Sequence, residues 1–439
     1  MSRWFLGSSL IVAGLVEAVL WGVRSGPGWL LLVALAFVLS HFLRWRLERR
    51  GNGWAGWLWL GSAALASAPF LYHAQLVHLV APPLCFVALL LACFYTVSLP
   101  KPLEVMSTTV LFSWGSASEA VHMAASQLPR FSASTRKGLG MALPLVLLFG
   151  LLFVQADPAF QGFLAGWLGD WRDFSLRTVR WLLWAWLAGA VWLEARFDAP
   201  YLSQEVEGRG DAASWSIALH ATNLLFVSFL ACQARYLFAG LAPAGMTLAQ
   251  YARHGFFELF AATLLVVALV VWVQGLTYRT ENARSAVLAS QGLLLLTFGL
   301  VASSTQRMSL YVQHFGLTLT RAYVLAALVG IVATLVLCCW ALAQGRSPQW
   351  LRARLLLLGM FSLSGVALTN VELWVARVNL SRPEVDMAYL QGLSSDIAPA
   401  LAQRPKLLGS VLSQNPPQDW REFTWSYYEA QQRKRTASE

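Results

Sequence analysis

The chain has 439 residues, of which 57% are hydrophobic and 12% are charged. A soluble globular domain carries about twice that charged fraction, so this composition excludes an ordinary soluble protein. The formal net charge of +10 could indicate a nucleic-acid partner. Most basic residues, however, lie in or beside short joints between apolar runs, and this distribution orients a membrane protein. We therefore expect membrane lipids as partners and no nucleic acid.

Apolar runs of roughly twenty residues recur along the chain. A helix needs about 20 such residues to cross a hydrocarbon core of about 30 Å. Many of the 21 Trp lie near the ends of these runs, as in the aromatic belts of membrane proteins. The pattern predicts an all-α polytopic transmembrane helix bundle of about eleven spans with a small helical C-terminal tail. The predicted spans are residues 4–23, 28–43, 54–71, 76–99, 139–155, 179–195, 214–232, 256–274, 286–304, 322–343 and 355–376.

Four regions follow from the joints. Residues 1–99 form four spans, 100–138 a cytoplasmic amphipathic joint, 139–376 a bundle of about seven helices, and 377–439 a polar helical tail. With the N-terminus inside, the inner joints hold sixteen Lys and Arg and the outer joints eight, which the positive-inside rule favours. An odd span count then places the tail on the outer face; a count of ten or twelve would change its side.

Catalytic and metal-binding motifs are missing from the sequence. The five Cys lie within or at the edge of apolar runs, and none has the spacing of zinc ligands. No zinc-protease, nucleophile-elbow, P-loop or dinucleotide-binding pattern falls on a suitable element. We expect neither a metal nor a cofactor. Whether the protein is an enzyme stays open, and the sequence favours a protein without catalytic activity.

A few polar residues fall at or near membrane depth, where ionisable groups are costly. Glu258 begins a predicted span and shares a helical face with Tyr251. It is either a proton-accepting or substrate-contacting carboxylate, or a helix-start carboxylate favoured by the macrodipole. Asp157, before Pro158, is either a helix cap or a catalytic carboxylate at the membrane surface.

Two further sets of polar residues each have two possible roles. Ser216, His220 and Asn223 form a stripe on one predicted span, and they either line a water-filled path or bond between packed helices. Near the end of the last predicted span, Glu372 either pairs with Arg377 to fix the span to the tail or contributes to an outer-face binding site.

Short segments in the second two-thirds of the chain resemble a known family. The chain is similar to uncharacterised bacterial multi-pass membrane proteins, domains of unknown function of the 4153/4173 type. The resemblance covers about residues 138 to 432, implies a bacterial inner-membrane protein and brings no established activity. The matching residues are 156–160, 233–238, 251–253, 255–258, Tyr311, 315–318, Arg321, Asn370, Arg377, Asn379, Asp386, Tyr389, Leu390, Leu393, Ser394, Asp396, Trp420 and Arg421.

Three functions are compatible with these features. The leading one is a non-enzymatic protein of envelope sensing or assembly that binds an envelope protein or lipid-linked glycan on its outer, periplasmic face. The alternatives are a transporter or channel with a polar path near His220, Asn223 and Glu258, and an enzyme on lipid-linked substrates at the outer leaflet. The candidate outer-face site comprises Asp157, Arg235, Tyr236, Tyr251, Arg253, Glu258, Arg321, Asn370 and Arg377.

Overall fold

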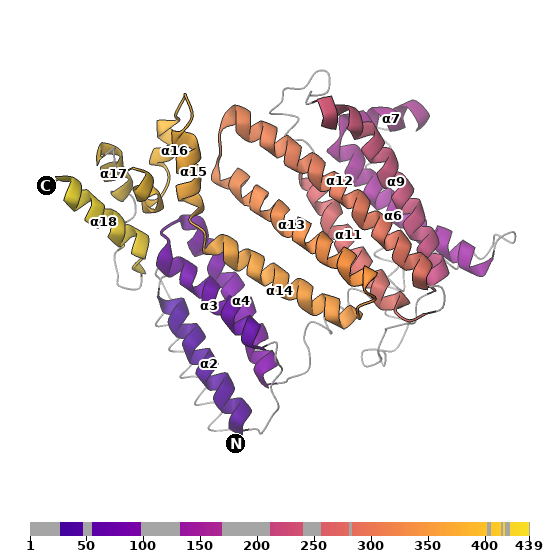
Figure 1. The fold of residues 1–439 in the computed structure, drawn as a ribbon, viewed down its shortest axis with the longest axis horizontal. Helices are drawn as coiled ribbons and strands as arrows, with labels where there is room; N and C mark the ends of the chain where they lie inside the picture. Colours follow the sequence, from indigo (N-terminus) through magenta and orange to yellow (C-terminus); the bar gives the residue numbers. More distant parts are fainter. Residues whose placement is uncertain are drawn as a thin grey trace. The chain divides into compact units, whose positions relative to one another are not determined.

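The computed structural model describes residues 27–46, 55–97, 132–168, 211–239, 256–280, 283–401, 405–413, 416–417 and 422–438. Within these ranges the chain forms fifteen helices and no strand (Figure 1), which confirms the all-α class. Six described helices are long and apolar enough to cross a membrane, so the count of eleven spans is not confirmed. They are α6 (Ala133–Ala156), α9 (Ala212–Ala239), α11 (Phe256–Thr277), α12 (Ala283–Phe315), α13 (Leu319–Ala343) and α14 (Pro348–Ala367).

The predicted spans meet the helices unevenly. Residues 4–23 and 179–195 lie outside the described part of the chain. The last predicted span, 355–376, is wrong as a single helix, because α14 ends at Ala367 and a separate helix, α15 (Val371–Leu380), follows. Asn370 causes the break: its side-chain oxygen accepts a hydrogen bond from the Leu373 amide and so caps the start of α15. The other eight predicted spans each coincide with a helix.

Contacts divide the chain into two compact units. The first comprises Met1–Lys101, Gly316–Ala326 and Leu356–Glu439, and the second Pro102–Phe315 and Ala327–Leu355. The division therefore falls within α13 and α14. It also groups the N-terminal helices with the C-terminal segment, which are distant in the sequence.

The first unit contains three apolar helices that pack side by side (Figure 1). Their core includes the buried side chains of Leu58, Trp59 and Cys85, against which Met360 of α14 packs. Phe37 meets the Trp59 ring edge-on with ring centroids 5.2 Å apart, a favoured aromatic geometry. The three helices are α2 (Gly28–Arg46), α3 (Ala55–Leu71) and α4 (Gln75–Val97), and the C-terminal segment adds α15, α16 (Met387–Gln391), η2 (Ser395–Ala400), α17 (Pro405–Leu412) and α18 (Trp425–Ser438).

An aromatic core holds part of the second unit, in which α6 and α9 lie side by side and α12 packs on α9 (Figure 1). Phe153 of α6 stacks on Phe229 of α9 with ring centroids 4.0 Å apart and meets Phe226 edge-on at 4.8 Å. Phe160 of the short helix α7 (Pro158–Leu168) meets Phe229 edge-on. All four rings are fully buried, so these contacts fix the α6–α7 corner against α9.

One glycine of α6 lies where this helix packs closely against α9. A Cβ at Gly138 would lie 2.8 Å from the Ser214 carbonyl oxygen and 2.8 Å from the Ile217 Cβ, whereas one at Gly150 would meet open space. We expect Gly138→Ala to lower the midpoint of thermal unfolding in detergent, because rigid backbone of α9 would have to move. The matched control Gly150→Ala should leave it unchanged or raise stability by up to about 1 kcal/mol, because Ala favours helix. Equal midpoints for the two variants would contradict the close approach.

Candidate functional site

A carboxylate from the C-terminal segment caps one of the N-terminal helices of the first unit. The Asp396 carboxyl oxygens accept hydrogen bonds from the backbone amides of His73 at 2.8 Å and Ala74 at 2.9 Å. These amides precede Gln75, the first residue of α4, where unsatisfied N–H groups and the helix dipole favour an anion. Asp396 is only 2% exposed. Burial raises the pKa of its carboxyl, although the hydrogen bonds from the His73 and Ala74 amides oppose that rise.

The helix break at Asn370 connects to the same segment. While its oxygen caps α15, the Asn370 side-chain amide donates to the Asp396 carbonyl oxygen at 2.9 Å. Two residues later, the Glu372 carboxyl accepts from the Ser394 amide at 2.7 Å and from the Ser394 hydroxyl at 2.6 Å. The partner of Glu372 is thus Ser394, and the ion pair with Arg377, one of the two roles predicted for Glu372, is not formed. Arg377 itself is exposed on α15.

A second set of polar contacts surrounds the turn between α12 and α13. Gly316 adopts a positive φ of 76°, which suits glycine. Asn379 uses both ends of its amide on Leu317, accepting from its N–H at 3.0 Å and donating to its carbonyl at 2.7 Å. The Tyr389 hydroxyl accepts from the Leu319 amide at 3.0 Å, and Arg321 donates to the Gly316 carbonyl. These bonds hold α15 and α16 to the start of α13.

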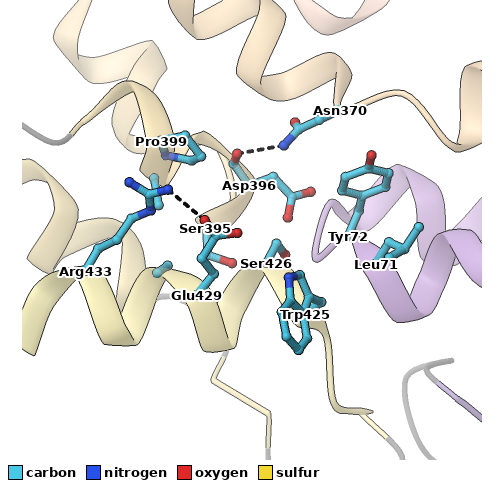
Figure 2. A pocket seen from close by; sticks show the side chains of 12 residues that line it. Leu71, Tyr72, Asn370, Ser395, Asp396, Pro399, Trp425, Ser426, Glu429 and Arg433 are labelled. Carbon is cyan, nitrogen blue, oxygen red and sulfur yellow. Dashed lines mark hydrogen bonds and ion pairs between the residues drawn. The ribbon is translucent and has the colours of Figure 1, made fainter.

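A pocket of about 160 Å³ opens beside the Asp396 cap. Figure 2 shows the Asp396 carboxyl pointing toward Tyr72, which directly follows α3, while α18 lines another side of the pocket. The side chains of Trp425, Glu429 and Arg433 project from α18 into this region. The remaining lining residues are Leu71, Asn370, Ser395, Ala398, Pro399, Ser426 and Ala430.

The polar groups of the pocket fall into two kinds. Asp396 and Asn370 are committed to the backbone, as described above. By contrast, Ser395 is 2% exposed, and its hydroxyl has no hydrogen-bond partner among the described residues. Trp425 is 52% exposed, and Glu429 pairs with Arg433 at 2.7 Å with both side chains partly exposed. A buried hydroxyl, an accessible indole and an ion pair can recognise a polar ligand with an apolar face.

Asp157, a predicted site residue, belongs to the second unit and is fully buried. Its carboxylate forms an ion pair with Arg307 of α12 at 2.6 Å and accepts from the Gln233 amide of α9 at 3.0 Å. It also accepts from the Phe160 amide at 3.4 Å, so it caps the start of α7, one of its two predicted roles. Asp157 therefore joins three helices within the unit.

The structure describes only some of the other predicted site residues. Glu258 lies half-buried in the first turn of α11, where a carboxylate is favoured by the helix dipole. Tyr251 and Arg253 lie outside the described residues. Arg235 and Tyr236 belong to α9, but their side chains are outside the described part of the chain.

The polar stripe of α9 contacts α12. The Ser216 hydroxyl bonds the Ser285 hydroxyl at 2.5 Å, and the Asn223 amide donates to the Ala289 carbonyl at 3.0 Å. His220 is exposed, and its Nδ1 bonds the Ser216 carbonyl of its own helix at 2.7 Å. Ser216 and Asn223 thus make the interhelical bonds that were one of the two predictions for this stripe, and any role in transport stays a prediction.

Sequence reasoning missed the partners of these carboxylates. Arg307 falls between the predicted spans 286–304 and 322–343 and was therefore expected in an outer joint, but α12 continues unbroken to Phe315. The absence of Gly or Pro between residues 300 and 315 was the available signal. His73 and Ala74 contribute only backbone amides, which a sequence does not mark. Ser395, Glu429 and Arg433 were also missed, and only the i, i+4 spacing of the last two gave a hint.

Comparison with known proteins gives one match. A family model described as Domain of unknown function (DUF4153) matches residues 10–403. No curated protein and no solved structure matches the chain. Within the described residues, no group of three or more His, Cys, Asp and Glu is placed to hold a metal ion.

The buried Glu372 predicts a pH-dependent stability. Burial, with a smaller contribution from the negative charge of Asp396, raises the pKa of Glu372 from 4.5 to about 7. The folded state therefore binds more protons at Glu372 than the unfolded state between these values, so the contribution of this group to stability is fully present below about pH 4.5 and is lost as the pH rises through 7. Glu372→Gln keeps an acceptor for Ser394 and should flatten thermal unfolding midpoints measured between pH 5 and 8. The exposed control Glu384→Gln should keep the wild-type slope, and a slope unchanged in Glu372→Gln would contradict the assignment.

The buried ion pair of the second unit predicts a large cost when it is broken. Arg307→Met leaves the Asp157 charge buried, and we expect a loss of about 3 to 5 kcal/mol in unfolding free energy. Adding Asp157→Asn should recover part of that loss. Arg433→Gln breaks an exposed pair of similar length and should cost less than about 1 kcal/mol. Similar denaturation curves for Arg307→Met and Arg433→Gln would show that burial does not determine how much an ion pair contributes to the free energy of unfolding.

Proposed function

The chain belongs to the DUF4153 family of domains of unknown function, and we propose that it is a non-enzymatic membrane protein whose C-terminal helices bind a hydroxyl-rich envelope component, such as a sugar residue of an envelope glycan. The proposal places the protein in a bacterial inner membrane, with the C-terminal segment on the periplasmic side. The asymmetric distribution of Lys and Arg between the joints supports that orientation.

The proposal rests on a difference among the polar groups of the pocket: some are hydrogen-bonded to the backbone, and others are not. Asp396 and Asn370 are used by backbone amides and a carbonyl, and this fixes the pocket wall. The buried Ser395 hydroxyl, the exposed Trp425 indole and the Glu429–Arg433 pair remain to face a ligand. Fixed walls that bear a few directed polar groups are a feature of binding sites.

The same groups define the ligand chemistry. The indole of Trp425 offers an apolar face to a ring, and its area favours stacking. Glu429 accepts and Arg433 donates hydrogen bonds, as the hydroxyls of a sugar require. At about 160 Å³, the pocket is smaller than the roughly 300 to 1,000 Å³ of drug-sized sites. It therefore suits one sugar residue of a longer chain, with the remainder outside.

A binding measurement tests the proposal directly. The wild-type protein in phosphatidylcholine nanodiscs is titrated calorimetrically with oligosaccharides of glucose and of N-acetylglucosamine. We expect Trp425→Ala to weaken binding of the preferred sugar at least about tenfold, as loss of an aromatic anchor does at interfaces. Ser395→Ala should weaken it less, because it removes one hydrogen bond and no stacking area.

Trp374→Ala provides the matched control. Trp374 is 45% exposed and lies on α15 of the same unit, but it does not line the pocket. Its replacement should leave the affinity unchanged. Equal losses in the two tryptophan variants, or no binding of either sugar by the wild type, would refute the pocket's role. Turnover of a sugar would refute the non-enzymatic assignment.

A further inference from the structure

The pocket of the first unit lies at the ends of apolar helices. α14, a candidate membrane span, ends at Ala367, and Asn370, which lines the pocket, follows three residues later. α3 is an apolar helix that ends at Leu71, and both Leu71 and Tyr72 line the same pocket (Figure 2). The ends of membrane helices lie at the depth of the lipid headgroups, so the pocket is located at that depth.

A hydrogen bond joins the ends of the two helices. The Tyr72 hydroxyl donates to the Leu368 carbonyl oxygen at 2.7 Å, so the residue after α3 contacts the residue after α14. The amides of His73 and Ala74, which Asp396 binds at the start of α4, directly follow Tyr72. The ends of α3 and α14 and the start of α4 therefore meet beside the pocket.

Large apolar side chains are exposed on these helices close to the pocket. Leu79 of α4 is 69% exposed and lies about 6 Å along the helix axis from Gln75, at a rise of about 1.5 Å per residue. On the α14 side, Leu368 is 37% exposed, and Phe361, about two turns earlier, is 41% exposed. Exposed apolar surface of this kind marks a contact with hydrocarbon. The hydrocarbon therefore begins within about one helical turn of the pocket.

Ring contacts place the α18 side of the pocket at the same depth. The ring centroid of Phe70, on α3, lies 5.8 Å from that of Phe423, which lies 6.2 Å from that of Tyr428 on α18. Tyr428 in turn lies 5.8 Å from Trp425, and both of these side chains are exposed. Exposed Tyr and Trp beside the end of an apolar helix are typical of the headgroup region. The indole that we assign to sugar stacking is therefore at that depth.

We infer that the pocket holds the sugar headgroup of a glycolipid, whose acyl chains stay in the bilayer beside Leu71 and α14. The inference rests on the proposed sugar-binding function and adds the class of ligand. The pocket of about 160 Å³ suits one sugar ring, and in a glycosyl diacylglycerol that ring is bonded directly to the glycerol at headgroup depth. Lipid attachment also confines the sugar to the surface where the pocket lies, which raises its effective concentration.

Competition between a soluble and a lipid-attached sugar tests the inference in the intact protein. The dissociation constant (Kd) of the preferred soluble oligosaccharide is measured calorimetrically in phosphatidylcholine nanodiscs, with and without a small fraction of a diacylglycerol that carries the same sugar. We expect this lipid to raise the apparent Kd of the soluble sugar at least about tenfold, because a tethered ligand reaches millimolar effective concentrations. Diacylglycerol without a sugar should leave the Kd unchanged.

A spacer distinguishes a pocket at the membrane surface from one above it. A second lipid carries the same sugar through a flexible poly(ethylene glycol) spacer, so that the sugar reaches well beyond the headgroups. Effective concentration falls as a tether becomes longer than the distance it must span, so the directly attached sugar should compete more strongly. Stronger competition by the lipid with the spacer would place the pocket above the headgroups and overturn the inference.

Leu71→Ala tests the side of the pocket where the lipid enters. The substitution removes apolar contact for the glycerol and the first methylene groups. The ratio of the affinities for lipid-attached and soluble sugar should therefore fall about fourfold, the equivalent of one buried methylene group. The matched control Leu60→Ala removes the same atoms from an exposed position of α3, about 16 Å away along the helix, and should keep the wild-type ratio. Size-exclusion profiles and thermal midpoints confirm that each variant is folded.

The possible results separate this inference from the proposed function. Competition by the directly attached sugar, weakened in Leu71→Ala and not in Leu60→Ala, supports a glycolipid as the ligand. Binding of the soluble sugar without competition from the directly attached one overturns the inference and leaves the proposed function intact. An unchanged affinity ratio in Leu71→Ala, or an equal fall in Leu60→Ala, overturns it as well. If the soluble sugar does not bind at all, the proposed function fails and the inference fails with it.

Discussion

The hydrogen bonds from the start of α4 to Asp396 are the constraint on which the first unit depends. They connect residues more than 300 positions apart and bring a carboxylate to amides that a helix leaves unsatisfied. Because Asp396 is buried, loss of either side would leave a charge or an amide without compensation, which is costly in low dielectric. The cap thus determines where η2 lies, and η2 with α18 then forms the wall of the pocket.

Several of the polar residues that carry the family resemblance hold helices together in this chain. Asn370, Asn379, Tyr389 and Asp396 bond backbone groups in the first unit, and Asp157 joins three helices in the second. Such buried polar groups specify one arrangement of helices, because hydrophobic packing in a bilayer distinguishes poorly between alternatives. Ser395 and Trp425, which we assign to ligand binding, lie beside Asp396 and Asn370 in the lining of the pocket.

The helical class and most span positions could be predicted because hydrocarbon imposes one length and one composition on a spanning helix. The predicted span boundaries were wrong where a helix contacts other parts of the protein and hydropathy no longer determines its length. Arg307 lies inside α12 because Asp157 neutralises it, and a single sequence does not show that the two are paired across 150 residues. Asn370 divides an apolar run that hydropathy alone predicts to be one continuous helix. The pocket could not be predicted, because its walls come from α3, η2 and α18, which only the folded chain brings together.

Residues 282 to 371 contain six arginines and no Asp or Glu, so any carboxylate partner of these arginines must come from another part of the chain. Arg307 finds Asp157, and Arg321 donates to a backbone carbonyl beside Gly316. Arg346 and Arg354 each lie against an indole, which attracts a cation. The buried Arg307 therefore has its counter-ion on another part of the same unit. Burial is what makes that carboxylate necessary, because a charge buried without a partner is costly, whereas an arginine that reaches water needs none.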